Sequence, residues 1–248
     1  MLLLTSVTII CGRLYSMQLL KLLLVLILIL TIVSPVLAGE KWKMTSLAWG
    51  PYSGHDLPQQ GRSIAKLRKA LQACNIELVV EFFPWARAKV TAAQPGYVGY
   101  FPAWPEEVKG GFIASPPVDW SKIAIMSRDK INLPKDLDSI FATNIVGLIK
   151  NYTYPEEIEK IAKRHKRNID EAPDENSLVR KLIRGRCDLA ITDPEVMKYY
   201  AKKNGLKNIV VVKEISTNPL VFAIKKSEKS EHVLKILKKA LNKEPCAR

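Results

Sequence analysis

Short apolar strands alternate with amphipathic helices along most of this chain of 248 residues. The strand candidates are residues 43–49, 76–84, 123–128, 143–149, 187–192, 208–214 and 219–226. Apolar side chains recur every three or four positions in the helix candidates, which are residues 62–74, 85–93, 154–165, 177–185, 193–205 and 231–243. Thr153 with Glu156 predicts the capped start of one helix, and Gly185 predicts the left-handed end of another. This alternation predicts an α/β fold with helices on both faces of its sheets.

The first 38 residues have the pattern of a signal peptide. From Met17 a short charged start, MQLLK, leads into an apolar run that ends in VLA at 36–38. The run is just long enough to span a bilayer, but Pro35 and the small residues of VLA favour cleavage after Ala38. Residues 1–16 then read as an upstream, misassigned start. No cysteine follows the cleavage site, so we expect a free protein in a Gram-negative periplasm.

The net charge of +14 raises the question of an anionic partner. The basic residues are scattered, however. Their densest run, KIAKRHKRN at 160–168, lies on a predicted helix and precedes the acidic segment DEAPDEN. The pattern favours a solvated helix face over a phosphate site, and we expect no nucleic-acid partner for an exported protein.

Cysteine spacing and catalytic motifs exclude several classes of site. Cys11 belongs to the leader, which leaves Cys74, Cys187 and Cys246. These show no CxxC or Cys/His spacing, so we expect neither a metal nor a cofactor. Three thiols in an oxidising compartment allow one disulfide and one free cysteine. The sequence also contains no GxSxG, HExxH or P-loop motif.

Residues 97–105, YVGYFPAWP, form an aromatic segment without charge. Pro102 and Pro105 exclude an ordinary helix, because each lacks an amide hydrogen and clashes with the preceding turn. The segment also departs from the alternation of a regular strand. A rigid aromatic stretch of this kind forms either part of a core or the wall of a binding site.

The order of several motifs resembles a known family. They are WGPYSG at 49–54, PWARA at 84–88, GYFPAWPEE at 99–107, ASPPV at 114–118, VGLIKNYTYPEE at 146–157 and GRCDLAITDP at 185–194. Together they resemble a divergent branch of the polar amino-acid-type periplasmic solute-binding proteins of ABC importers.

The resemblance implies a type II-like periplasmic-binding-protein fold, in which each of two lobes is a sheet flanked by helices. It places lobe one at 39–122 and 217–248, and lobe two at 123–216. Two crossover strands, near 121–126 and 213–218, would join the lobes.

In lobe one the resemblance implies ligand contacts from aromatic residues. Trp49 and Tyr52 follow the first strand, where the family places an aromatic side chain against the ligand. Tyr100, Phe101 and Trp104 lie in the loop that faces the ligand. Clefts need such apolar walls with a few placed polar groups. The alternative is that these aromatics only fill the interior of the lobe.

In lobe two the resemblance points to two further places. Asn151, Tyr152 and Thr153 stand where family members present a helix N-terminus to an anionic ligand group. Asp193 matches the carboxylate that holds a ligand amino group. Each has a simpler interpretation as a helix cap, and Asp193 followed by Pro194 is well suited to that role.

The sequence departs from the family at the arginine that clamps a ligand carboxylate. Val108 stands at that position, and the neighbouring Lys109 would point elsewhere. Arg87 of PWARA offers a cation from another side, with a surface salt bridge or helix cap as its alternative role. The departure argues against ordinary α-amino-acid binding and leaves the ligand unspecified.

The order of the lobes implied by the resemblance, in which the chain ends in lobe one, suggests a disulfide between Cys74 and Cys246. Cys74 ends the first helix of lobe one, and Cys246 follows the last helix, which returns to lobe one. Cys187 begins a strand of lobe two and is expected to be buried as a small apolar residue.

These observations predict a monomeric binding protein that captures a small polar solute between its lobes and delivers it to the membrane permease of an ABC importer. One alternative is an enzyme on the same fold, resembling periplasmic dehydratases, with pocket carboxylates as general acid and base. The scarcity of paired carboxylates and histidines near the predicted loops favours binding. Another alternative, an orphan sensor or receptor module, is equally compatible with the fold.

Overall fold

The computed structural model describes residues 39–206 and 209–246. The predicted signal peptide, with the upstream start at 1–16, lies outside the described residues. Glu40–Arg248 forms one compact unit. Among the described residues, no helix has both the length and the apolar character needed to cross a membrane.

The unit contains strands, α-helices and three short 3-10 turns. The strands are β1 (Glu40–Ser46), β2 (Ile76–Phe82), β3 (Gly99–Ala103), β4 (Phe112–Ser127), β5 (Val146–Ile149), β6 (Ile169–Ala172), β7 (Leu189–Thr192) and β8 (Val210–Lys225). The α-helices are α2 (Arg62–Gln72), α3 (Trp85–Ala92), α4 (Leu137–Thr143), α5 (Glu156–Arg164), α6 (Glu175–Ile183), α7 (Pro194–Lys203) and α8 (Ser230–Leu241). The 3-10 turns are η1 (Pro58–Gln60), η2 (Pro105–Glu107) and η3 (Lys166–Asn168).

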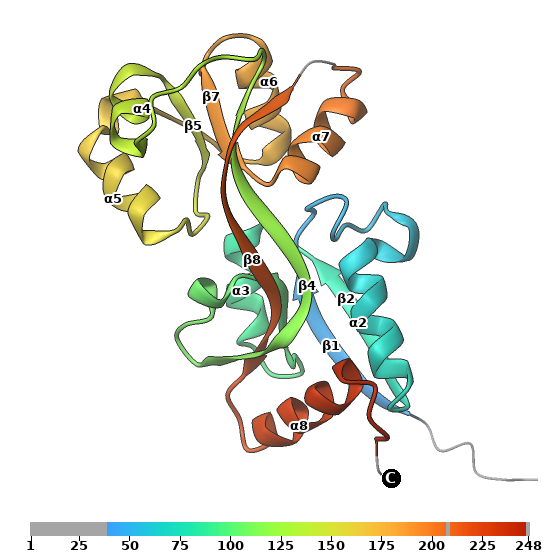
Figure 1. Ribbon diagram of the computed structural model, residues 1–248. Helices are drawn as coiled ribbons and strands as arrows, with labels where there is room; N and C mark the ends of the chain where they lie inside the picture. The colour runs from blue at the N-terminus through green and yellow to red at the C-terminus, as the bar shows by residue number, and fades with distance from the viewer. Residues whose placement is uncertain (1–38, 207–208, 247–248) are drawn as a thin grey trace, which may run out of the picture. The chain divides into compact units, whose positions relative to one another are not determined.

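Two long antiparallel strands, β4 and β8, connect the two halves of the sheet. The strand order is β2-β1-β3-β8-β4-β7-β5-β6. β4 and β8 pair along their whole length, from Phe112 opposite Lys225 to Ser127 opposite Val210. In Figure 1 the green β4 and the dark red β8 run side by side between the two groups of elements. The sheets of the two halves are therefore continuous through β4 and β8.

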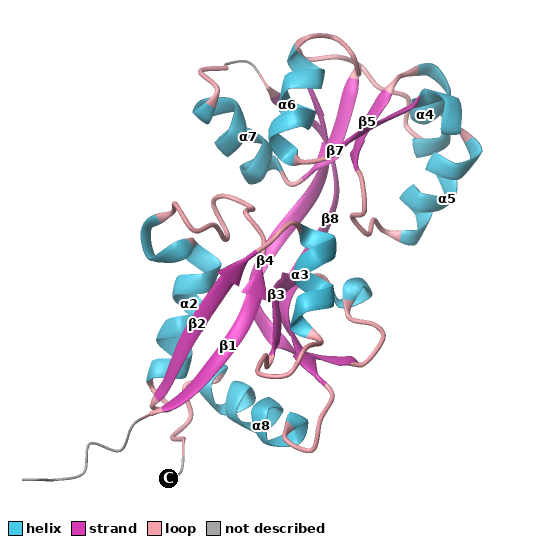
Figure 2. Ribbon diagram, turned by 180° about the vertical axis from the view of Figure 1, so that it is seen from behind, coloured by secondary structure: helices cyan, strands magenta, loops and turns pink. Residues whose placement is uncertain are grey.

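We use the predicted boundaries, 39–122 with 217–248 and 123–216, to name lobe one and lobe two, and they remain a prediction. β1, β2 and β3 are mutually parallel in lobe one, as are β5, β6 and β7 in lobe two. Figure 2 shows helices on both sides of the strands in each lobe. Apolar faces of these helices and strands form the interior, for example Leu67, Leu71 and Phe222 in lobe one and Leu178 and Leu182 in lobe two.

The connecting strands are longer than the sequence predicted. Residues 208–214 and 219–226 were expected as two strands, but they form the single strand β8. β4 begins at Phe112 rather than near residue 123, and it contains Pro116 and Pro117. The register of the β4–β8 ladder shifts on both sides of Pro117, which accommodates residues without an amide hydrogen.

Two helix starts in lobe two differ from expectation. Thr153 does not cap α5: the helix begins at Glu156, and Pro155 occupies the N-cap position without a side-chain hydrogen bond. Proline disfavours helical geometry in the residue before it, so the helix cannot extend back through Tyr154. The sequence also failed to predict α4, which Asp136 caps by accepting a 2.7 Å hydrogen bond from the Ser139 amide.

The predicted end of α6 is confirmed. Gly185 has a φ of +71°, a value that strains any residue with a Cβ atom. Its amide bonds the Leu182 carbonyl at 3.1 Å, and the Arg186 amide bonds the Lys181 carbonyl at 2.9 Å. These two bonds satisfy carbonyl groups at the helix end.

Cys74 and Cys246 form a disulfide with a Cα–Cα separation of 5.2 Å, which lies within the usual range. The bond ties the segment after α8 to the end of α2. Cys187 is a buried free thiol, and burial raises its pKa to about 12. It therefore behaves as a small apolar side chain at the start of β7.

Candidate functional site

Two adjoining cavities lie between the lobes. The outer cavity has a volume of about 660 Å³ and is lined by Phe82 and Trp85 from lobe one and by Tyr152 and Glu175 from lobe two. The inner cavity has a volume of about 20 Å³, and it shares Leu47, Trp85 and Tyr152 with the outer one. A volume near 300–1,000 Å³ is typical of a small-molecule site, and we call the two cavities together the cleft.

Three tryptophans of lobe one line the inner cavity. Trp49, Trp85 and Trp104 each come one to three residues after the end of β1, β2 or β3. Because parallel strands end at the same edge of a sheet, the three side chains gather at the interlobe edge. The rings of Trp49 and Trp104 meet edge to face, with centroids 6.3 Å apart.

Glu107 is a carboxylate held among these tryptophans. Its Oε1 accepts a 2.7 Å hydrogen bond from Trp85 Nε1, and its Oε2 accepts a 3.1 Å bond from the Trp104 amide. The Tyr100 hydroxyl donates to the Glu107 carbonyl at 2.9 Å and fixes the backbone. Burial raises the pKa of the Glu107 carboxyl, although both hydrogen bonds act to lower it.

Glu175 approaches the cleft from the first turn of α6 in lobe two. It is 2 % exposed, and its Oε1 accepts hydrogen bonds from Thr192 Oγ1 at 2.7 Å and from Trp49 Nε1 at 3.3 Å. Its Oε2 has no hydrogen-bond partner among the described residues. Burial raises the pKa of Glu175 to about 7. The cleft thus contains a buried acid whose second oxygen lacks a hydrogen-bond partner among the described residues.

Tyr152 stands between the two acids. It follows β5 and lines both cavities. Burial raises its pKa, and the nearby charges of Glu175 and Glu107 raise it further. Asn151, one residue earlier, lines the outer cavity and adopts a left-handed backbone with a φ of 67°. The turn after β5 therefore places an aromatic ring and an amide at the cleft, and no helix N-terminus.

Asp193 and Tyr52 meet across the lobes without lining the cleft. Asp193 caps α7, because its Oδ1 accepts hydrogen bonds from the Glu195 and Val196 amides at 2.7 and 3.1 Å. Its Oδ2 accepts 2.8 Å bonds from the Tyr52 hydroxyl and from the Lys122 amide. These four bonds satisfy the carboxylate. The structure therefore gives Asp193 partners from the protein at every acceptor position.

Two further polar contacts join the lobes near this pair. Arg62 of lobe one binds Glu195 of lobe two through both guanidinium nitrogens, and its guanidinium lies over the Tyr52 ring, 4.3 Å from the centroid. The Tyr200 hydroxyl donates to the Ala48 carbonyl at 3.1 Å. We call Tyr52, Arg62, Asp193 and Glu195 the bracket.

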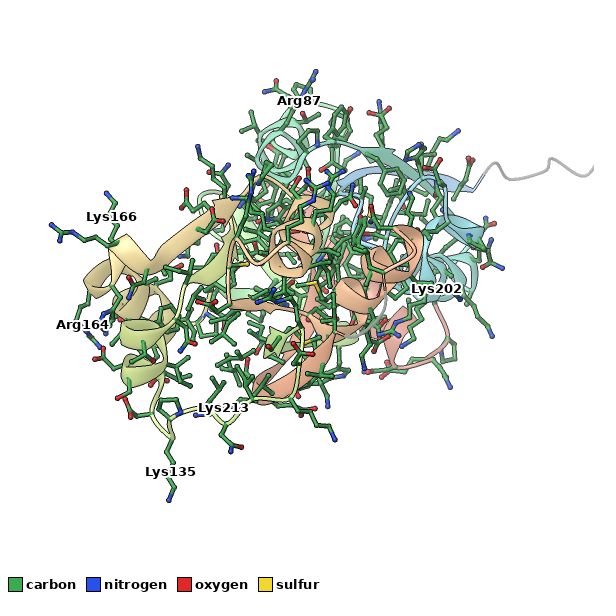
Figure 3. The ribbon with its side chains drawn as sticks, turned by 90° about the horizontal axis from the view of Figure 1, so that it is seen from above. Arg87, Lys135, Arg164, Lys166, Lys202 and Lys213 are labelled. Carbon is green, nitrogen blue, oxygen red and sulfur yellow. A yellow bond between two sulfur atoms is a disulfide. The ribbon has the colours of Figure 1, made fainter. Side chains whose placement is uncertain are left out.

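Four other predicted residues lie away from the cleft. Phe101 is fully buried against Phe222, with ring centroids 6.5 Å apart. Tyr100 is buried and holds the backbone beneath Glu107. Thr153 lines neither cavity. Arg87 is exposed, its guanidinium lies 5.4 Å from the Phe83 ring centroid, and Figure 3 shows it pointing outwards.

The cleft thus contains Trp49, Trp104, Asn151 and Tyr152 of the predicted residues, and the sequence analysis missed Trp85, Glu107 and Glu175. Trp85 could have been found, because like Trp49 it comes three residues after a strand. Glu175 has the same spacing from β6, but β6 is a four-residue strand that the sequence pattern did not reveal. Glu107 lies in the segment where the sequence analysis looked only for a basic residue.

The remaining charge is consistent with a solvated surface. Figure 3 shows the labelled Lys135, Arg164 and Lys166 pointing outwards. Within the described ranges, no group of three or more His, Cys, Asp or Glu residues could hold a metal ion.

Similarity to known proteins is structural. No protein-family model matches the sequence, and no curated protein matches it significantly. A histidine kinase sensor domain with similarity to periplasmic binding proteins has a TM-score of 0.69 at 16% identity over 83% of this chain and 90% of the other. An ancestral arginine-binding protein bound to arginine has a TM-score of 0.68 at 19% identity over 83% and 92%.

A third solved structure is the ancestral amino acid-binding protein AncCDT-1, a precursor of cyclohexadienyl dehydratase. Its TM-score is 0.63 at 19% identity, over 82% of this chain and 88% of that protein. Identities at this level establish the fold alone. Glu40–Arg248 therefore has the two-lobe fold of periplasmic-binding-protein-like proteins, with an aromatic and acidic cleft between its lobes.

Proposed function

We propose that this protein is an extracytoplasmic binding protein that captures a small polar solute in its cleft. The observation that carries the proposal is the outer cavity of about 660 Å³, to which both lobes contribute aromatic and polar side chains. In a two-lobe fold, a ligand that contacts both lobes stabilises the closed arrangement, because it binds that arrangement more tightly. The similar sensor domain and arginine-binding protein support a ligand-binding module of this kind.

Delivery to the permease of an ABC importer, as a monomer, is the second part of the proposal. It is supported by the motif resemblance and by the predicted cleavage after Ala38, which would release the protein into the periplasm. The prediction is checked by mass spectrometry of periplasmic protein, which should find an N-terminus at or near Gly39. An intact leader on membrane-retained protein would instead support a tethered sensor.

Ligand capture is tested by a thermal-shift screen of small polar solutes. A ligand that binds only the folded state raises the melting temperature. At a ligand concentration of 100 times the dissociation constant, it adds about 2.7 kcal/mol to the free energy of unfolding. Ala48→Trp places a large ring in the outer cavity and should abolish the shift. Ala142→Trp makes the same change at an exposed position of α4 and should preserve it. Equal responses from the two variants would contradict binding in this cleft.

A dehydratase-like enzyme is the second candidate, and the structure weakens the sequence argument against it. Two acids, the half-buried Glu107 and the buried Glu175, do share one cleft. A carboxyl with a pKa of about 7 suits a general acid. Both oxygens of Glu107 already accept hydrogen bonds, however, so a freely exchanging pair is not formed. We therefore place binding first. Incubating the wild-type protein and Glu175→Gln with each ligand found, followed by NMR, distinguishes turnover from binding.

A further inference from the structure

The cleft offers acidic groups where a ligand would be most deeply buried. Glu107 lines the inner cavity, and among the described residues that line this cavity none is basic. The buried Glu175 and the exposed Asp174 line the outer cavity, where the basic side chains are the exposed Lys150 and His55. The less exposed ionisable side chains of the cleft are therefore acids and tyrosines, and its basic side chains lie at the rim.

One half-buried lysine, Lys89, acts on Glu107 without neutralising the site. Lys89 Nζ stands 5.1 Å from the centroid of the Trp85 ring, and it lines neither cavity. Its charge acts to lower the pKa of Glu107, but burial prevails and the pKa remains raised. Glu107 therefore remains an acid whose ionised form would be stabilised by a further cation.

The aromatic residues around these acids suit a cation as well. The faces of tryptophan and tyrosine rings attract cations, and the attraction grows when the cation is desolvated. Trp49, Trp85, Trp104 and Tyr152 all line the inner cavity. Glu107 lines the same cavity, and Glu175 accepts a hydrogen bond from the Trp49 indole. Aromatic rings therefore surround a small volume that has one acid in its wall and a second acid next to it.

The size of the inner cavity limits the group that enters it. Its volume of about 20 Å³ accommodates about one water-sized group. A primary ammonium group has that size and carries three hydrogen-bond donors. Trimethylammonium and carboxylate groups are larger. Glu107 supplies the carboxylate in the wall of this cavity. Glu175 lines the outer cavity and lies next to the inner one, because its Oε1 accepts a hydrogen bond from Trp49 Nε1.

We propose that the cleft binds its solute through a primary alkylammonium group and lacks an arginine anchor for a ligand carboxylate. The ammonium group occupies the inner cavity among the tryptophans, where Glu107 balances its charge from the cavity wall and Glu175 adds negative charge from the adjoining outer cavity. The alkyl part of the solute lies in the outer cavity. This inference rests on the proposed binding function, and it names the chemical class of the ligand.

A matched set of four-carbon probes tests the charge preference. Butylamine, 1,4-diaminobutane, butyrate and 4-aminobutyrate are titrated while tryptophan fluorescence is recorded, since three of the five tryptophans line the cleft. Butylamine and 1,4-diaminobutane should bind at least tenfold more tightly than butyrate. Butyrate binding as tightly as butylamine would overturn the inference.

Two variants locate the binding group. Glu175→Gln removes the charge and keeps the one oxygen that accepts from Trp49 and Thr192. Glu107→Gln removes the charge and keeps one of its two accepted hydrogen bonds. Each should weaken butylamine binding at least tenfold. Glu156→Gln removes the same charge from an exposed position of α5 and should leave binding within twofold. Circular dichroism and a cooperative melting curve establish that each variant is folded.

The outcomes separate this inference from the proposed function. If the twenty common amino acids stabilise the protein but the amines do not, the binding function stands and the ammonium inference is wrong. If butylamine binds equally to wild type and Glu175→Gln, the inference is also wrong. If no solute in either set binds, the proposed function fails, and the inference fails with it.

Discussion

The bracket and the cleft both contain residues of lobe one and lobe two, but they differ in how far their buried acids are hydrogen-bonded. In the bracket, the Asp193 carboxylate accepts four hydrogen bonds from protein groups. In the cleft, Glu175 accepts bonds at one oxygen and has no partner among the described residues at the other. Both acids are nearly fully buried, at 1 % and 2 % exposure.

The difference indicates where interaction energy remains available for a ligand. A buried acid with all its partners stabilises the fold and gains nothing from a solute. A buried acid with a missing partner costs free energy until a donor arrives. The bracket therefore fixes how the lobes meet, whereas the cleft favours binding of a donor from outside the protein.

The largest expected effect comes from removing the satisfied acid. Asp193→Ala deletes a helix cap and leaves the Tyr52 hydroxyl and the Lys122 amide without a partner, so we expect the free energy of unfolding to fall by about 4 kcal/mol. Chemical denaturation measures it. Asp136→Ala, which removes only an exposed cap, should cost much less. Similar losses from the two variants would show that Asp193 acts as a cap alone.

Glu175, the acid with an unpartnered oxygen, should make the free energy of unfolding depend on pH. The folded-state pKa of Glu175 is about 7 instead of its usual 4.5, because burial disfavours the charged form. Its contribution to stability is therefore complete below pH 4.5 and is lost as the pH rises through 7. Between these values the free energy of unfolding should fall by about 3 kcal/mol more in wild type than in Glu175→Gln.

The comparison between wild type and Glu175→Gln requires that the other charged groups near Glu175 are the same in both proteins. The charged and titratable groups that act on it or respond to it are Asp193, Asp174, Tyr152, Tyr154 and Tyr200. Denaturation curves of wild type and Glu175→Gln, measured every half pH unit, cancel their contributions in the difference. Parallel pH profiles would mean that Glu175 titrates near its ordinary value.

A smaller effect is expected from the hydroxyl that crosses the bracket. Tyr52→Phe keeps the ring but removes one donor from the Asp193 carboxylate, at a cost of about 2 kcal/mol. The matched variant is Tyr97→Phe, which removes a hydroxyl bonded to Glu81 at the surface and should change stability little. Thermal and chemical unfolding of the two variants compare them directly. If Tyr52→Phe leaves the free energy of unfolding unchanged, the Tyr52–Asp193 hydrogen bond does not stabilise the protein.

The smallest expected effect belongs to the exposed part of the bracket. Arg62 and Glu195 have side chains that are 40% and 52% exposed, and pairs of this kind contribute only about 0–1 kcal/mol. A double-mutant cycle with Arg62→Ala and Glu195→Ala measures their coupling, and 1 M salt should reduce it. A coupling above 2 kcal/mol would show that the pair is shielded from solvent.

Local signals in the sequence account well for the elements of the fold and poorly for their lengths. Helical periodicity identified α2, α6, α7 and α8, and Gly185 marked a helix end, because each depends on neighbouring residues. β4 and β8 were mistaken for shorter segments. Their continuity comes from pairing with each other across about a hundred residues of chain, and the two prolines in β4 hid it.

For the cleft residues too, sequence signals identified some positions and missed those that depend on distant pairing. The family resemblance pointed to Trp49, Trp104 and Tyr152. Glu175 depended on recognising β6, a strand of four residues that is defined by its pairing with β5. Asp193 was identified as a ligand contact or a cap, and no feature of its own segment predicts that Tyr52, 141 positions away, would reach it.

The sequence alone determined the strand–helix alternation, most helix positions and the aromatic character of the loops after the strands, because these follow from the spacing and chemistry of adjacent residues. Only the tertiary structure decided which buried acid is satisfied and which is not. That depends on donors brought from the opposite lobe, and their positions are set by how β4 and β8 pair rather than by any local pattern.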